Sequence, residues 1–147
     1  MLFRSSGQIC AEIAKSLNWK KEERPQSTAR MAIVVLEDYH LLGKQMVHSA
    51  LQASGFDLLD YGRKDLDGLV EKVKEDAIEI LLVSTLMLRS ALRVEQLRKR
   101  LTDEKLQVKL IVGGAPFRFD RELWKKVGAD AMGLNTAEAL QIVKRLL

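Results

Sequence analysis

The sequence has little of several residue types, and each shortage narrows what the protein can be. Its 147 residues include one cysteine, Cys10, which cannot form an internal disulfide, and only two prolines. No stretch reaches the roughly 18 uncharged apolar residues that a membrane span needs, and the first seven residues lack the continuous apolar segment of a secretory signal. We therefore expect no membrane association and a reducing compartment, the cytoplasm.

The remaining composition is typical of a soluble globular domain. Hydrophobic residues make up 47% of the chain and charged residues 30%, which fits one domain with a single core. The formal net charge of +4 permits an anionic partner without requiring one. The basic run Arg98-Lys99-Arg100 has no aromatic residues interleaved and is typical of a solvated helix face, so we expect no nucleic-acid partner.

The first thirty residues differ from the rest of the chain. Ile9, Ile13 and Leu17 recur every four positions and predict a short amphipathic helix over residues 6–17. A polar segment broken by a proline follows and has the composition of a linker. Because so short a helix is marginal in water by itself, we expect the arm of residues 1–30 to dock on the main domain, on a second copy or on a partner.

From residue 31 onward, apolar runs alternate with helical patterns. The runs predict strands over residues 31–36, 56–59, 78–83, 108–112 and 129–133. The intervening patterns predict helices over residues 43–54, from 65, 92–101, 120–127 and 135–146, the second and fourth capped by Asp65 and Asp120 and the last by Asn135 with Glu138. Within the helix over 92–101 we expect Leu92, Gln96, Leu97 and Leu101 to lie inward or nearly so.

Five such units with apolar strands predict an α/β domain over residues 31–147. The sheet should be parallel, doubly wound and covered on both faces, with the flavodoxin-like (Rossmann-like) strand order 2-1-3-4-5. In that order a ligand binds beyond the carboxyl ends of the first and third strands, at the topological switch point. The residues after the first, third and fourth strands are therefore the place to look for function.

These strand ends exclude several common uses of the fold. They contain neither G-x-G-x-x-G nor G-x-x-x-x-G-K-[ST], so the usual nucleotide-phosphate loops are absent. Ser84 and Gly133 stand where a phosphoacceptor receiver domain needs an aspartate and a lysine. Residues 37–43 are not the Ser/Thr-rich phosphate loop of a flavodoxin.

A histidine remains after the first strand, with a carboxylate two residues before it. Histidine binds a metal through one ring nitrogen, and a carboxylate commonly holds its other N–H, a role for which Asp38 is placed beside His40. One histidine cannot hold a bare metal tightly, so a metal here needs another source of ligands, such as a macrocycle. Taken alone, His40 is more typical of an ordinary loop histidine, and Asp38 of a turn residue.

Three short motifs at these strand ends resemble the signature of the cobalamin-binding domain family: Asp38-x-His40-x-x-Gly43, Ser84-x-Leu86 and Gly113-Gly114. The resemblance covers residues 31–147. Within the family, the sequence is most similar to methyltransferase-associated corrinoid proteins. It implies that a cobalamin or related corrinoid binds with its lower base detached from cobalt. His40 would take the vacated lower axial position on the metal.

The resemblance also implies a slot between strands for the detached nucleotide tail. Gly113 and Gly114 would leave room for it, Ser84 would offer a hydroxyl to the base, and Leu86 would form an apolar wall. Gly43 belongs to the same cofactor site. The ordinary alternative is that these three glycines serve only the start of a helix or a tight turn.

A further implied feature is a proton-linked relay. Ser90 matches a position where relatives place a hydroxyl that bonds the Asp38 carboxylate, so Asp38, His40 and Ser90 would act together. Alternatively, Ser90 is only the N-cap of its helix. The sequence departs from the family at Glu37, where glycine is frequent, and at Leu88, where threonine is frequent.

The function implied is that of a corrinoid protein, not catalytic alone, that carries a methyl group on cobalt between a donor methyltransferase and an acceptor enzyme. A small cobalamin-binding subunit of an adenosylcobalamin-dependent mutase and a cobalamin sensor remain alternatives. The expected partners are a methyltransferase and a second copy of the chain bound through the amino-terminal helix. Thirty residues cannot form the helical bundle that caps the cofactor in relatives, so the upper face is open or covered by a partner.

Overall fold

The computed structural model describes residues 29–38 and 41–146. They contain a five-stranded, all-parallel sheet of order β2-β1-β3-β4-β5, which confirms the predicted strand order. The expected amino-terminal helix, residues 1–28 of the arm and His40 lie outside the described residues. Within the described ranges, no helix is both long enough and apolar enough to cross a membrane.

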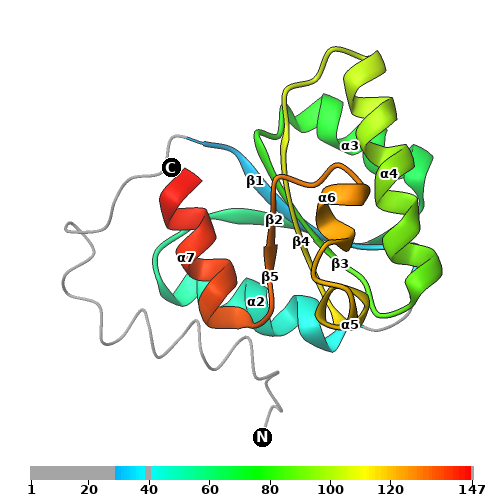
Figure 1. The fold of residues 1–147 in the computed structure, drawn as a ribbon. Coiled ribbons are helices and arrows are strands. Elements are labelled where there is room, and N and C mark those ends of the chain that lie inside the picture. Colours follow the sequence, from blue (N-terminus) through cyan, green and yellow to red (C-terminus); the bar gives the residue numbers. More distant parts are fainter. Residues whose placement is uncertain (1–28, 39–40, 147) are drawn as a thin grey trace, which may run out of the picture.

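Helices cover both faces of the sheet (Figure 1). The strands are β1 (Met31–Leu36), β2 (Leu58–Lys64), β3 (Ile80–Ser84), β4 (Lys109–Gly113) and β5 (Ala131–Gly133). The helices are α2 (Leu42–Ala53), α3 (Leu66–Asp76), α4 (Leu88–Asp103), α5 (Ala115–Phe119), α6 (Leu123–Lys126) and α7 (Thr136–Leu146). Helices α2 and α7 lie on one face, and α3 to α6 on the other.

The interior strand β1 is buried along its whole length, as its continuous apolar run predicts. Successive side chains point to opposite faces of a strand, so Val34 joins the core under α3 and α4 while Ile33 joins the core under α2 and α7. Both cores extend through the alternating residues of β3 and β4. The same strands therefore contribute side chains to the cores on both faces of the sheet.

The second strand differs most from its prediction. It spans Leu58–Lys64 instead of residues 56–59, because β2 is an edge strand paired only with β1. Its backbone completes the ladder, and its side chains are mostly half-buried or exposed. Polar residues are tolerated on such an edge, so an apolar run could not mark where this strand ends.

A partly buried ion pair joins α2 to this edge strand. The Nζ of Lys44, whose side chain is 4% exposed, lies 2.6 Å from each carboxylate oxygen of Asp60. Burial opposes ionisation of Asp60, but hydrogen bonds from Lys44 and the Gly62 N–H outweigh it, and the pKa of Asp60 is lowered. For His48, which is half-buried beside this pair, burial disfavours the charged imidazolium and lowers the pKa.

Two of the predicted helix caps are confirmed. Asp65 accepts a hydrogen bond from the Gly68 N–H at 2.8 Å at the start of α3. Before α7, the Glu138 N–H donates to Asn135 Oδ1 at 2.9 Å, and Glu138 Oε2 accepts from the Leu134 N–H at 2.6 Å. These residues fix the loop between β5 and α7, which borders the site described below.

Two helix predictions are wrong in detail. The pattern over residues 120–127 contains only the short helix α6, and the preceding helix α5 was not predicted; Asp120 accepts from the Glu122 N–H at 3.0 Å in the turn between the two helices. Helix α4 begins at Leu88, earlier than predicted, and its buried face also differs from the predicted one. Leu92 and Gln96 are exposed, and the inward side chains are those of Ser90, Ala91, Val94, Leu97 and Leu101.

Candidate functional site

The segments after β1, β3 and β4 meet at one edge of the sheet. The strands pair in register, with Val35 opposite Ser84, Ser84 opposite Gly113, and Gly113 opposite Gly133. Parallel strands end at the same edge, so the residues that follow them are brought together there. This edge is the switch point that the strand order predicts.

Asp38 ties the end of β1 to the start of α4. The residue is 1% exposed, and its Oδ2 accepts hydrogen bonds from the N–H groups of Leu86 at 2.7 Å and Met87 at 2.9 Å. Met87 is the N-cap of α4, and its own side chain makes no capping bond. Asp38 therefore provides both an acceptor and a negative charge at the amino terminus of that helix.

We expect Asp38→Ala to lower the free energy of unfolding by about 2 kcal/mol, because two backbone donors lose their acceptor. Asp38→Asn should lose less, since its amide oxygen still accepts both bonds but without the charge. Urea denaturation of the wild type and both variants measures the effect. We call these two hydrogen bonds the Asp38 clamp. A midpoint for Asp38→Ala equal to that of the wild type would contradict it.

Ser90 is placed differently from the expectation. It lies inside the first turn of α4, 1% exposed, so the alternative that it is the N-cap is wrong. Its hydroxyl donates to the backbone oxygen of Glu37 at 2.9 Å instead of to the Asp38 carboxylate. Ser90 thus holds the residue next to Asp38, and its single donor proton is engaged in that bond.

Glu37 explains this geometry. Its φ is +47°, in the left-handed region that favours glycine, the residue frequent at this position in the family that the motifs resemble. Two contacts secure the turn: Glu37 Oε2 accepts from the Leu66 N–H at 3.1 Å and pairs with Arg93 Nη2 at 3.0 Å. The chain leaves β1 sharply, directly before the segment that carries His40.

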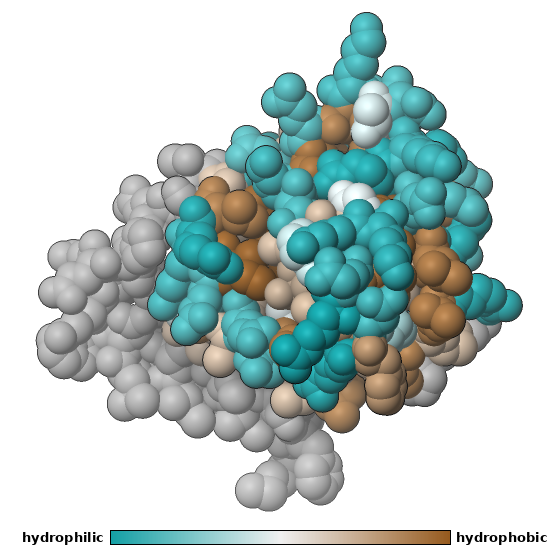
Figure 2. Space-filling model, in the orientation of Figure 1, coloured by the Kyte–Doolittle hydropathy of each residue, from teal (hydrophilic) through white to brown (hydrophobic). Residues whose placement is uncertain are grey.

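Apolar side chains surround this edge without being buried. Phe119, at the end of α5, is 91% exposed, and Leu42, Met46, Leu86 and Leu88 are also exposed. Figure 2 shows hydrophobic side chains gathered at the lower right of the molecule, around α5 and the beginning of α4. Among the residues that the structure describes, none buries these side chains, which we call the apolar rim.

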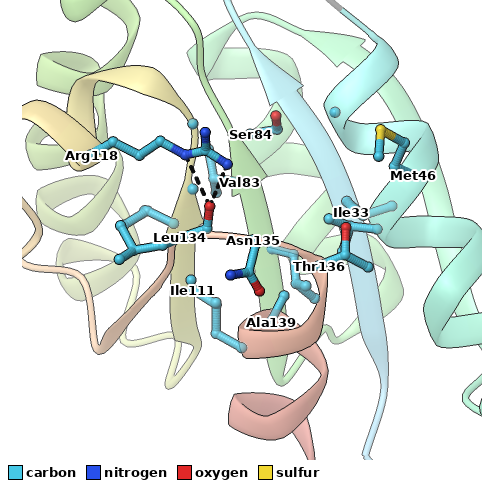
Figure 3. Close-up of a pocket in the computed structure, with 17 residues that line it drawn as sticks. Ile33, Met46, Val83, Ser84, Ile111, Arg118, Leu134, Asn135, Thr136 and Ala139 are labelled. Carbon is cyan, nitrogen blue, oxygen red and sulfur yellow. Dashed lines mark hydrogen bonds between the residues drawn. The ribbon is translucent and has the colours of Figure 1, made fainter.

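A cavity of about 240 Å³ opens beside the rim, between the sheet and helices α2 and α7 (Figure 3). Four of the predicted site residues line it together: Gly43, Ser84, Gly113 and Gly114. Asp38, Leu86 and Ser90 are not among its lining residues. The Leu86 side chain is 44% exposed at the rim, so the apolar walls come from other residues.

Several lining residues were not predicted. The walls are made by strand residues on the α2/α7 face, Ile33, Leu82 and Ile111, with Val47 of α2. The strand residues among them belong to the continuous apolar runs that predicted the strands, but those runs do not show which residues face a cavity. Arg118, Asn135 and Thr136 also line the cavity; Asn135 was predicted only as a helix cap, and no motif marked the other two.

The glycines at this edge have two different reasons to be glycine. A Cβ on Gly113 would lie 3.2 Å from the backbone oxygen of Gly133, and one on Gly43 would lie 3.7 Å from Ser84 Oγ. These are contacts that small shifts can relieve. Gly114 has φ +120°, and a Cβ there would lie 1.6 Å from the Thr85 oxygen. Gly114 is therefore required by the packing of the backbone itself.

The comparisons with known proteins define the class. The model of the B12 binding domain family matches residues 30–143, and the chain belongs to this family. Among its relatives, the trimethylamine corrinoid protein of Methanosarcina barkeri is 35% identical over 133 residues. That match covers 87% of this chain and 60% of the relative, so the chain spans about three fifths of the curated protein's length.

Solved structures agree with this assignment. A cobalamin-binding protein from Desulfitobacterium hafniense DCB-2 superposes with a TM-score of 0.80 at 27% identity, covering 96% of this chain and 68% of the other. The monomethylamine corrinoid protein of Methanosarcina barkeri gives a TM-score of 0.73 at 31% identity, covering 97% and 69%. The family identifies the ligand as cobalamin or a related corrinoid.

The cavity fits one part of that ligand. Its volume lies just below the roughly 300 Å³ at which small-molecule sites begin, so it suits the nucleotide tail and not the whole corrinoid. The apolar walls suit a flat aromatic base, and Gly113 and Gly133 put no side chain in its way. Ser84, Asn135 and Thr136 lie around the cavity with groups that can form hydrogen bonds (Figure 3).

Proposed function

We propose that this chain is a corrinoid protein that carries a methyl group between a donor methyltransferase and an acceptor enzyme. The proposal rests on one observation: the Asp38 clamp and the glycine-bordered cavity lie at the same edge of the sheet. His40 follows two residues after Asp38 in the sequence. When bound, the corrinoid supplies a cobalt atom that accepts and releases the methyl group.

The residues of the chain have separate tasks in this proposal. His40 would supply a nitrogen ligand to the cobalt, and Asp38 and Ser90 hold the segment that precedes it against α4. The cavity beside Ser84 and Gly113 holds the tail. The ring lies on the rim, where Leu86 is one of the exposed apolar side chains.

A methyltransferase partner would cover the rest of that rim. Exposed apolar groups around one edge are typical of an interaction surface, and Phe119 is the most exposed of them. The curated relatives are named for trimethylamine and monomethylamine. Methylated amines are therefore the first donors to test, together with the methyltransferases that use them.

The binding step is tested by reconstitution with hydroxocobalamin and methylcobalamin, gel filtration and an absorbance spectrum. We expect about one corrinoid retained per chain. Transfer is then tested by adding a donor, its methyltransferase and the loaded protein, and following methylation of the cobalt by absorbance. Loss of all corrinoid on the column would contradict binding. Retention without methylation, but with activity in a mutase assay, would favour the mutase subunit.

We expect His40→Ala to retain the corrinoid, because the described residues that line the cavity would still hold the nucleotide tail. With the cobalt in its paramagnetic divalent state, the wild type should show hyperfine coupling to one protein nitrogen, and His40→Ala should lose it. The measurement is electron paramagnetic resonance with a corrinoid that lacks the lower base. His48→Ala is the matched control and should keep the coupling. An unchanged spectrum for His40→Ala would remove His40 as the ligand.

A further inference from the structure

One positively charged side chain lines the tail cavity, the cavity proposed to hold the nucleotide tail. Of the described residues that line it, Arg118 is the only charged one. It comes from α5, which follows β4 directly, and its side chain reaches across to the loop between β5 and α7. Figure 3 shows the guanidinium group beside the cavity, near Val83.

The guanidinium is oriented but not neutralised. Its Nε and Nη2 donate to the backbone oxygen of Leu134 at 3.0 and 2.6 Å, and the third nitrogen is turned away from that oxygen (Figure 3). The nearby carboxylate of Glu138 is bound to the Leu134 N–H. None of the ion pairs formed among the described residues includes Arg118.

The chemistry of a corrinoid supplies an anion for this position. A phosphodiester links the ring to the ribose and base of the nucleotide tail. With the base in the cavity and the ring on the rim, this link has to pass the cavity mouth. Arginine suits phosphate recognition because its planar, permanently charged fork presents several donors to the oxygens.

We propose that Arg118 binds the phosphodiester of the corrinoid tail and thereby favours corrinoids with a complete nucleotide. The inference rests on the proposed corrinoid binding and adds to it a residue outside the three family-like motifs. Arg118 then acts on affinity and ligand choice, whereas His40 acts on the metal. The two residues are separable by experiment.

The test compares cobalamin with cobinamide, which has the same ring but no nucleotide. We expect Arg118→Gln to raise the Kd for cobalamin roughly tenfold, a modest effect because the group is exposed, and to leave the Kd for cobinamide unchanged. Added salt should weaken cobalamin binding by the wild type more than by the variant. Arg118→Lys should recover part of the affinity, and Arg121→Gln, an exposed arginine nearby, should bind like the wild type.

The outcomes separate this inference from the proposed function. If the wild type retains no cobalamin, the proposed function fails and the inference fails with it. If the wild type binds but Arg118→Gln binds equally well, only the inference is overturned. The same holds if the variant weakens cobinamide equally, or keeps the full salt dependence, since Arg118 would then act only by holding the Leu134 loop.

Discussion

Gly113→Leu is expected to abolish corrinoid retention and leave the protein folded. Gly113 lines the cavity, and a leucine side chain there would occupy the space proposed for the base. The new Cβ would lie 3.2 Å from the Gly133 oxygen, a tight contact that a shift of a few tenths of an ångström relieves. We expect an affinity loss on the order of 100-fold or more, which corresponds to about 2.7 kcal/mol.

The measurements are corrinoid retained after gel filtration and thermal unfolding of the same preparation. Gly113→Ala is the matched control, because it adds the same Cβ without the rest of the leucine side chain, and it should keep most of the binding. Full retention by Gly113→Leu would show that the tail does not occupy this cavity. The proposed function would then need another tail site.

Gly114→Ala, in contrast, is expected to destabilise the folded protein itself. The backbone there has φ +120°, and the new Cβ would lie 1.6 Å from the Thr85 oxygen and 2.7 Å from its carbonyl carbon. Both atoms belong to the backbone that follows β3, so no flexible side chain can move aside. We expect the free energy of unfolding to fall by more than about 4 kcal/mol, a loss typical of severe core or backbone defects.

Gly62→Ala separates this clash from the effect of a positive φ alone. Gly62 has φ +65°, and a Cβ there would meet nothing within 4 Å. In its alanine variant the free energy of unfolding should fall by only about 1 kcal/mol, the cost of holding an alanine in the left-handed backbone region. Urea denaturation of both variants makes the comparison. Equal midpoints would mean that the β3 and β4 loops do not approach as closely as described.

Much of the fold was predictable because buried strands carry their own pattern. The continuous apolar run of residues 31–36 predicted the interior strand β1 with its bounds, and the alternation of strands and helices predicted the sheet order. The edge strand was not predictable to its end, since pairing through the backbone does not require apolar side chains. The burial of Lys44 depends on Asp60 of that same strand, a partner that local sequence does not reveal.

The candidate site was predictable where it depends on strand ends. Ser84 and Gly113 had to meet because parallel strands end at one edge. The hydrogen bonds of the site were harder to predict. Asp38 and Leu86 stand 48 residues apart, and only the packing of α4 decides that the carboxylate meets these N–H groups and that Ser90 meets Glu37. Arg118 follows a glycine motif but has no pattern of its own.

The Asp38 clamp has a consequence for reading related sequences. This side chain serves the metal ligand in the proposed function and, independently, caps α4 in the fold. A descendant that abandoned the cofactor would be free to change the histidine at position 40, yet it would still need an acceptor at position 38. An aspartate retained there without the histidine would therefore record the architecture of the domain, and not its former chemistry.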